Sequence, residues 1–146
     1  MIKEFSGEYR WLSNFFPCLI IMGDLTYPSV ENAYQAAKYP VKDRLVFTTC
    51  SPAKAKRLGS SIKVPHGWED NKISLMRRLN KQKYQHGNYL RVMLVNTGEQ
   101  ELIEGNTWDD TFWGECDGVG ENNLGKILME IREETFGMSN RMAHGQ

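Results

Sequence analysis

The stretch Trp108–Gly125, WDDTFWGECDGVGENNLG, places two tryptophans, several acidic residues and a run of loop glycines directly before a helical pattern. The glycines are Gly114, Gly118 and Gly120, and the apolar residues at helical spacing after them are Leu124, Ile127, Leu128 and Ile131. Asn122 and Asn123 precede the repeat, so the pattern predicts an N-capped helix entered from a tight loop. Free backbone N–H groups at such a start attract phosphates, which makes the loop a candidate phosphate site. Gly-rich turns also occur without a ligand, so an architectural role stays open.

The composition is that of one soluble domain of ordinary size. A chain of 146 residues can bury a full core without disulfides or metal staples. The net charge is zero, so the chain lacks the basic field of proteins that grip nucleic acid through its phosphates. The three cysteines form no CxxC pair, which argues against a disulfide framework and a zinc site. No segment reaches the ~20 apolar residues of a membrane span, and no signal peptide is recognisable, so we expect a cytoplasmic protein without a metal.

The order of the patterns predicts one α+β domain over residues 1–136, mainly helical, with a small antiparallel β-sheet near the N-terminus. Residues 137–146 are expected to form a flexible tail. The expected strands are Ile2–Phe5, Cys18–Met22 and Leu25–Tyr27, joined by a turn at Gly23, with a further short strand at Glu101–Glu104. The expected helices are Val30–Tyr39, Val41–Cys50, Pro52–Leu58, Trp68–Gln85 and Tyr89–Val95.

Three polar residues lie together along one edge of the predicted helix that follows Ser29. At ~100° per residue, Glu31, Gln35 and Lys38 fall at the border between its apolar face and solvent. A boundary salt bridge is one interpretation, and at an exposed surface it would contribute only ~0 to 1 kcal/mol. The other interpretation is a cleft wall that carries an acid and an amine.

A lysine lies on the apolar stripe of the predicted helix Trp68–Gln85. Lys83 comes one turn after Leu79 on the side of the apolar residues instead of on the polar face. Either its stem lies on apolar surface while the ammonium reaches water, or the head group is held in a cleft. In a cleft, desolvation would lower the lysine pKa and leave a free amine able to attack carbonyls and imines. Its position alone leaves both interpretations open.

Five segments, in this order and with similar spacing, resemble the NADAR family, which is also described as YbiA-like. They are FSGEYRWLSNF, YPSVENAYQAAKY, MRRLNKQKYQ, LIEGNTWDDTFWG and GENNLGKILMEIR, and they extend from Phe5 to Arg132. The chain departs from the family at Asn32, where a histidine is usual, and at Tyr84, where phenylalanine is common. The ECDGVGEN part of the Trp-rich loop lies where the family varies.

The resemblance implies an N-glycosidase without a cofactor. The implied substrates carry ribose C1 on an exocyclic amine: ADP-ribosylated guanine in nucleic acid, or phosphoribosylamino-pyrimidine intermediates of riboflavin synthesis. By its match to the family's SxEhxxQ segment, Glu31 is the expected general acid/base. Lys83 and Lys38 are the amines expected to form a Schiff base with C1, unless water displaces the base directly.

The other expected site residues bind the nucleotide-like substrate. Tryptophans would stack on the base, aspartates would bind ribose hydroxyls, and glycines would admit a phosphate. The expected substrate-binding residues are Ser13, Asn14, Trp68, Trp108, Asp109, Trp113, Gly114, Asp117, Gly118, Gly120 and Asn122. The partner is therefore a small ADP-ribosyl or phosphoribosyl compound, with contact to modified nucleic acid open and no membrane contact. A non-catalytic module that binds ADP-ribose in the same cleft is the alternative function.

Overall fold

The computed structural model describes residues 1–85 and 87–143 and has the predicted α+β fold, in which helices dominate. The chain divides into two compact units, each with buried apolar side chains of its own. One is the Ser13–Lys83 unit, and the other, the two-segment unit, joins Met1–Leu12 to Tyr84–Gln146. Among the described residues, no helix has the length and apolar character needed to cross a membrane.

The predicted N-terminal hairpin is present in the Ser13–Lys83 unit. Strand β1 (Ile20–Met22) pairs antiparallel with β2 (Leu25–Tyr27), with Ile20 opposite Tyr27. Gly23 has φ +61° in the connecting turn, a conformation that glycine adopts without steric cost. Expected strand residues Cys18 and Leu19 lie outside β1, so the strand is shorter than the apolar run.

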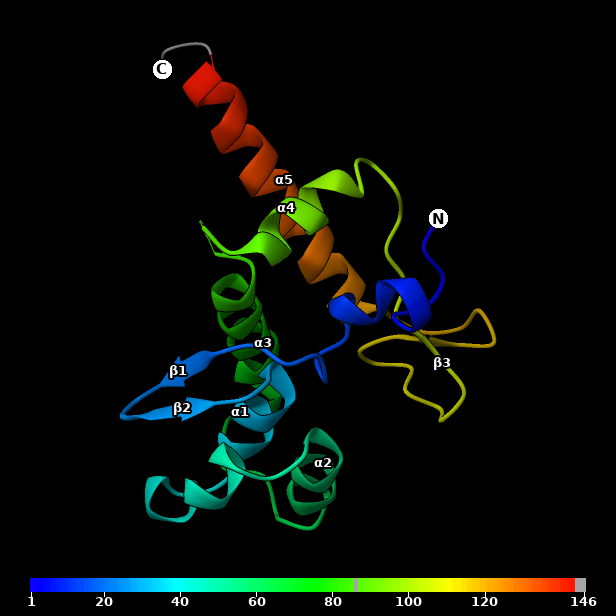
Figure 1. Ribbon diagram of the computed structural model, residues 1–146. Helices are drawn as coiled ribbons and strands as arrows, with labels where there is room; N and C mark the ends of the chain where they lie inside the picture. Colours follow the sequence, from blue (N-terminus) through cyan, green and yellow to red (C-terminus); the bar gives the residue numbers. More distant parts are fainter. Residues whose placement is uncertain (86, 144–146) are drawn as a thin grey trace. The chain divides into compact units, whose positions relative to one another are not determined.

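Helix α1 (Val30–Ala36) lies inside the Ser13–Lys83 unit, in contact with α2 (Pro52–Ser60) and α3 (Trp68–Lys83) (Figure 1). Ser29 caps it, because its hydroxyl accepts the backbone N–H of Asn32 at 3.1 Å. All seven residues of α1 are buried. The prediction that Glu31 and Gln35 lie at a solvent border was therefore wrong, because helices cover α1 on more than one side.

The segment between α1 and α2 is less regular than predicted. Instead of one helix over Val41–Cys50, it forms two 3-10 helices, Val41–Asp43 and Leu45–Thr48. The buried Asn32 side chain donates to the carbonyls of Phe47 at 2.9 Å and Cys50 at 2.8 Å. These bonds tie the end of the segment to α1. Helix α3 ends at Lys83, two residues before the predicted end.

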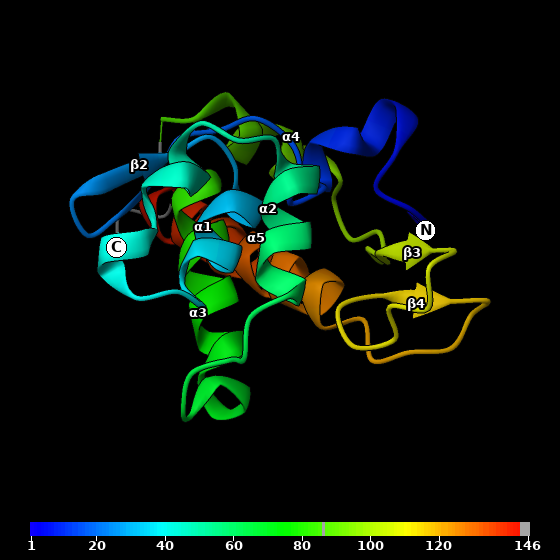
Figure 2. The same ribbon diagram turned by 90° about the horizontal axis from the view of Figure 1, so that it is seen from below.

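In the two-segment unit, a 3-10 helix (Gly7–Leu12) and α4 (Tyr89–Asn96) accompany a pair of very short strands. Figure 2 shows β3 (Gly105–Asn106) and β4 (Glu115–Cys116) side by side, and they pair in parallel. The expected strands Ile2–Phe5 and Glu101–Glu104 are reduced to one parallel bridge between Ile2 and Leu102. Each segment offers a single bridging residue, so no ladder forms.

Helix α5 (Asn123–Ala143) is the longest helix and contains the predicted apolar repeat. Its buried side chains are Leu124, Ile127, Leu128 and Ile131. The helix continues through Gly137 to Ala143, where the sequence predicted a loose tail, and residues 144–146 lie outside the described residues. One glycine costs a helix only about 1 kcal/mol relative to alanine, so it does not end this one.

Candidate functional site

Glu31 is a buried carboxylate on α1, with 7% of its surface exposed. The side chain of Gln35, one turn later, donates through Nε2 to Glu31 Oε1 at 2.9 Å. The backbone N–H of Glu31 donates to the carbonyl of Asn14 at 3.0 Å. A donor aimed at a carboxylate fixes its direction, which suits a group that moves protons in a set geometry.

Lys38 follows α1 and lies within electrostatic range of Glu31. Its Nζ lies 5.6 Å from the ring centroid of Tyr34 and 5.7 Å from that of Trp68, and it donates to the Gly59 carbonyl at 3.4 Å. Partial burial lowers the pKa of this lysine, while the charge of Glu31 acts to raise it. The predicted residues Glu31, Lys38 and Trp68 are therefore in one neighbourhood, with the Trp68 ring 5.2 Å from that of Tyr34.

Lys83 is fully buried at the end of α3, with 0% of its surface exposed. Its Nζ donates to the Ser13 carbonyl at 2.7 Å and lies 5.9 Å from the Phe16 ring. Burial lowers the pKa of Lys83 to about 7, against a smaller raising effect from Cys18. The interpretation in which the ammonium reaches water was wrong, because the stripe that Lys83 shares is closed over by the Ser13–Phe16 turn.

The predicted residues Ser13 and Asn14 connect Lys83 to Glu31. The Ser13 carbonyl accepts from Lys83, and the Asn14 carbonyl accepts from the N–H of Glu31. Asn80, fully buried on α3, donates through Nδ2 to Asn14 Oδ1 at 3.3 Å. This two-residue segment is thus anchored to α1 and to α3 through its backbone and through one side chain.

The Trp-rich loop Trp108–Asn122 belongs to the two-segment unit. At the start of α5, backbone N–H groups donate to carbonyls of the loop itself. These bonds are Asn122 to Gly114 at 3.2 Å, Asn123 to Phe112 at 3.2 Å and Leu124 to Trp113 at 3.0 Å. A phosphate site and an architectural role were both open interpretations of this loop, and the loop itself folds back and occupies these three donors.

The Asn122 side chain is also engaged within the protein. Its Oδ1 accepts the N–H of Glu104 at 2.9 Å, and its Nδ2 donates to the Leu102 carbonyl at 2.9 Å. The side chain therefore joins the loop to the 102–104 segment. With φ +51° and 5% exposure, Asn122 has a structural role that explains its place before the helix.

Two predicted glycines have geometric reasons to be glycine. A Cβ on Gly114 would overlap the Glu104 carbonyl oxygen, and one on Gly120 would overlap the Gly114 carbonyl oxygen. The close approach is between parts of the protein, so it neither requires nor excludes a ligand. Among the predicted aromatic residues, Trp108 is 58% exposed, whereas Trp113 packs edge-on against Phe112 at 4.8 Å between ring centroids.

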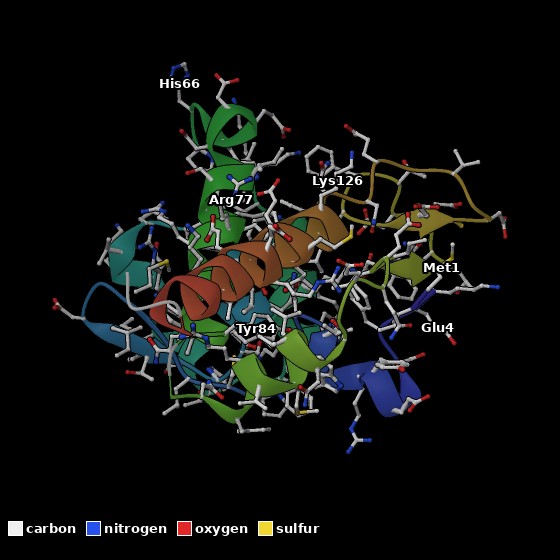
Figure 3. All side chains as sticks on the ribbon, turned by 90° about the horizontal axis from the view of Figure 1, so that it is seen from above. Met1, Glu4, His66, Arg77, Tyr84 and Lys126 are labelled. Atoms are coloured by element: carbon white, nitrogen blue, oxygen red, sulfur yellow. The ribbon has the colours of Figure 1, made fainter. Side chains whose placement is uncertain are left out.

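A cavity of about 580 Å³ lies in the two-segment unit and includes two of the predicted residues, Asp117 and Gly118. Its lining also contains Met1 and Glu4, labelled in Figure 3. Pockets for small molecules have volumes of this order. Asp109 is not in this lining; its carboxylate accepts from the Cys116 thiol at 3.7 Å. Asp109 and Asp117 both have positive φ, 64° and 53°.

Sequence reasoning missed several residues that organise these sites. Gln35 was predicted to lie beside Glu31 but not to be a site residue, although its amide donates to the Glu31 carboxylate. The Asp110 carboxylate, also not included, accepts the N–H groups of Phe112 at 3.2 Å and Trp113 at 2.9 Å. The available signals were a glutamine one turn after an acid and an aspartate two residues before a turn, both of which are local hydrogen-bonding patterns.

Comparisons with known proteins show which family and which relatives the chain is similar to. A family model described as the NADAR domain matches residues 2–135. The chain is 34% identical over 134 residues to an N-glycosidase YbiA of Shigella sonnei, covering 88% of this chain and 83% of that protein. It is 36% identical over 133 residues to a riboflavin biosynthesis protein of Vibrio vulnificus, covering 87% of this chain. The chain spans only 36% of that protein's length.

A solved structure is also similar. The NMR structure of the Escherichia coli protein YbiA aligns with a TM-score of 0.80 at 31% sequence identity. The alignment covers 95% of this chain and 89% of that one. The likeness confirms the predicted fold class and places the segments quoted from the sequence in a shared fold.

Proposed function

This chain belongs to the NADAR family and is a hydrolase that acts on N-glycosyl bonds, and we propose that its substrates carry ribose C1 on the exocyclic amine of a nucleobase-like group. The observation that carries the proposal is a buried carboxylate, Glu31, within electrostatic range of an amine of lowered pKa, Lys38. Sugars linked through an exocyclic nitrogen can open to an imine at C1. A neutral amine attacks such an imine, and a nearby acid completes the exchange.

Lys38 is the proposed nucleophile. Its neutral amine adds to C1 of the ring-opened sugar, the bond between C1 and the base nitrogen breaks, and Glu31 donates a proton to the departing amine. Water then adds to the C1=N bond of the Lys38 Schiff base, and Glu31 accepts a proton from that water. The adduct collapses to the free lysine and the free sugar. Each of the two steps returns the proton that the other uses.

Lys83 is the alternative nucleophile. Its pKa of about 7 leaves more neutral amine at physiological pH, but its side chain is fully buried and Nζ already donates to the Ser13 carbonyl. Lys38 is only partly buried, and aromatic rings flank it. We therefore propose that Lys38 attacks C1 and that Lys83 holds the Ser13–Asn14 segment through its hydrogen bond to the Ser13 carbonyl.

Two substrate classes fit this chemistry: a phosphoribosylamino-pyrimidine and ADP-ribosylated guanine in nucleic acid. The name of the Vibrio vulnificus relative supports the first, and so does the zero net charge of the chain. In the proposed complex, Trp68 stacks on the base.

The proposal is tested by offering both substrate classes and following release of the base by chromatography. Glu31→Gln should lower turnover by about 100- to 10,000-fold with an unchanged circular dichroism spectrum. Glu8→Gln, which alters an exposed glutamate, is the matched control and should keep the wild-type rate. Binding of ADP-ribose without release of any base would show that the chain is a binding module instead of an enzyme.

Borohydride reduction during turnover tests the covalent step. Mass spectrometry should find the sugar on Lys38 in the wild type and no adduct in Lys38→Met. An adduct on Lys83 would move the nucleophile to that residue. A fully active enzyme that yields no adduct on either lysine would favour direct displacement by water, with Glu31 as the base.

A further inference from the structure

The amide of Gln35 is held in a position that depends on its surroundings. Its Nε2 donates to Glu31 Oε1 at 2.9 Å, and its Oε1 is buried with no hydrogen-bond partner among the described residues. Gln35 is 5% exposed. A buried amide oxygen that accepts nothing has a free-energy cost of about 1–3 kcal/mol, so packing must hold this side chain in place.

The packing partner is Gly59 in the last turn of α2. A Cβ built on Gly59 would overlap Gln35 Oε1 and lie 2.5 Å from Gln35 Cδ and 3.1 Å from Gln35 Cβ. The methyl group of an alanine at position 59 and the present Gln35 side chain therefore cannot coexist. Gly59 is helical and has no positive φ, so its backbone conformation does not require glycine. The requirement for glycine here is space.

Gly59 also contacts the other half of the proposed site. Its carbonyl oxygen accepts from Lys38 Nζ at 3.4 Å. One residue thus leaves room for the amide that holds Glu31 and presents an acceptor to the amine. Glycine inside a helix is less favourable than alanine by about 1 kcal/mol. Position 59 is nevertheless a glycine, and the side chains of Gln35 and Lys38 both reach it.

We propose that Gly59 is a positioning residue of the N-glycosidase reaction, acting through the Gln35 amide on Glu31 and through its own carbonyl on Lys38. This inference rests on the proposed function, in which Glu31 is the acid/base and Lys38 the amine. It assigns α2, which carries neither group, a part in setting their geometry. Displacing a catalytic group by about 1 Å can lower a rate by about 100-fold, so one methyl group is a sufficient perturbation.

The test is a double-substitution cycle. Gly59→Ala should lower kcat by about 10- to 100-fold with a smaller change in KM, because the methyl group displaces the Gln35 amide. Gln35→Ala should also lower kcat, because Glu31 loses its donor. The double variant should be no slower than Gln35→Ala alone, because the new methyl group enters the space that the glutamine vacated. The helical Gly137, whose Cβ would meet nothing within 4 Å among the residues that the structure describes, provides the control Gly137→Ala.

A second readout does not depend on activity. In an NMR spectrum of the wild type, the Gln35 side-chain amide protons, identified by their loss in Gln35→Ala, should move on Glu31→Gln and on Gly59→Ala but not on Gly137→Ala. If Gly59→Ala does not fold, recovery of folding in the double variant carries the same information. A wild-type protein that releases no base would contradict the proposed function. An active wild type whose rate and Gln35 signals survive Gly59→Ala, or losses that multiply in the double variant, would overturn the positioning role alone.

Discussion

Replacing the buried amine by a neutral side chain of similar length should change how the stability of the protein depends on pH. Lys83 is 0% exposed and its pKa falls to about 7, whereas in the unfolded chain it has the ordinary value of 10.5. Between these two values the unfolded chain binds a proton that the folded protein has released. Wild-type stability therefore rises with pH over this window. In Lys83→Met the contribution is absent.

The magnitude follows from the two pKa values. Each pH unit well inside the window contributes about 1.4 kcal/mol, and near pH 7 about half of that, because Lys83 is then half protonated in the folded state. From pH 7 to pH 9, the stability of the wild type relative to Lys83→Met should rise by about 2 kcal/mol. The lost hydrogen bond to the Ser13 carbonyl shifts both ends equally and leaves this difference unchanged.

Urea unfolding followed by tryptophan fluorescence at pH 7, 8 and 9 measures the effect. Lys81→Met, which removes an exposed lysine from the same helix, is the matched control and should show a nearly constant offset from the wild type. A stability difference between wild type and Lys83→Met that stays flat over this range would mean that the folded-state pKa of Lys83 is ordinary. The reasoning from burial would then be wrong.

Three further changes test the structure elsewhere. The Asn32 side chain donates to two backbone carbonyls, and Asn32→Ala leaves both of them without this donor. Chemical unfolding should therefore show a loss of about 2 to 4 kcal/mol in the free energy of unfolding. Asp110→Ala removes the acceptor of two loop N–H groups and should lower stability by about 1 to 3 kcal/mol, as measured by chemical unfolding. Gly114→Ala should lower stability by at least about 2 kcal/mol because of backbone overlap. In contrast, Gly137→Ala, in open space within α5, should raise stability by about 0.5 to 1 kcal/mol.

The elements that local chemistry defines were predictable from the sequence. Ser29 caps α1, Gly23 turns the hairpin, and the apolar repeat of α5 is buried, each as its pattern indicated. The short strands were not predictable, because Ile2 finds a single partner, Leu102, and a one-residue bridge leaves no alternating pattern to read. The hydrogen bonds between the loop carbonyls and the N–H groups at the start of α5 were also not predictable, because they depend on the path of the loop in space.

The candidate site was predictable in its residues but not in its environments. Glu31, Lys38 and Lys83 were named from their positions on helical faces and from a family resemblance. An amphipathic pattern assumes that one side of a helix faces water, and α1 has no such side. Gly59 directly follows the predicted helix Pro52–Leu58, where a glycine is typical of a helix end. Its role depends on a side chain of α1 that only the folded structure brings against it.

The attraction between a charged Glu31 and a charged Lys38 stabilises the ion pair, whereas the proposed reaction needs both groups in their neutral forms. Burial lowers the pKa of Lys38, but the Glu31 carboxylate opposes this effect and favours the ammonium. Attack on C1 requires the neutral amine, and the leaving group requires a proton from Glu31. The reactive pair, a protonated Glu31 with a neutral Lys38, carries one proton, as does the unreactive ion pair. Because the two forms differ only in where that proton lies, their ratio does not change with pH while the pair holds one proton. Activity should therefore be flat between the two macroscopic pKa values of the pair and fall on either side. Substrate that binds against Lys38 removes water from its amine, which shifts the proton toward Glu31 and converts part of the binding energy into the reactive form.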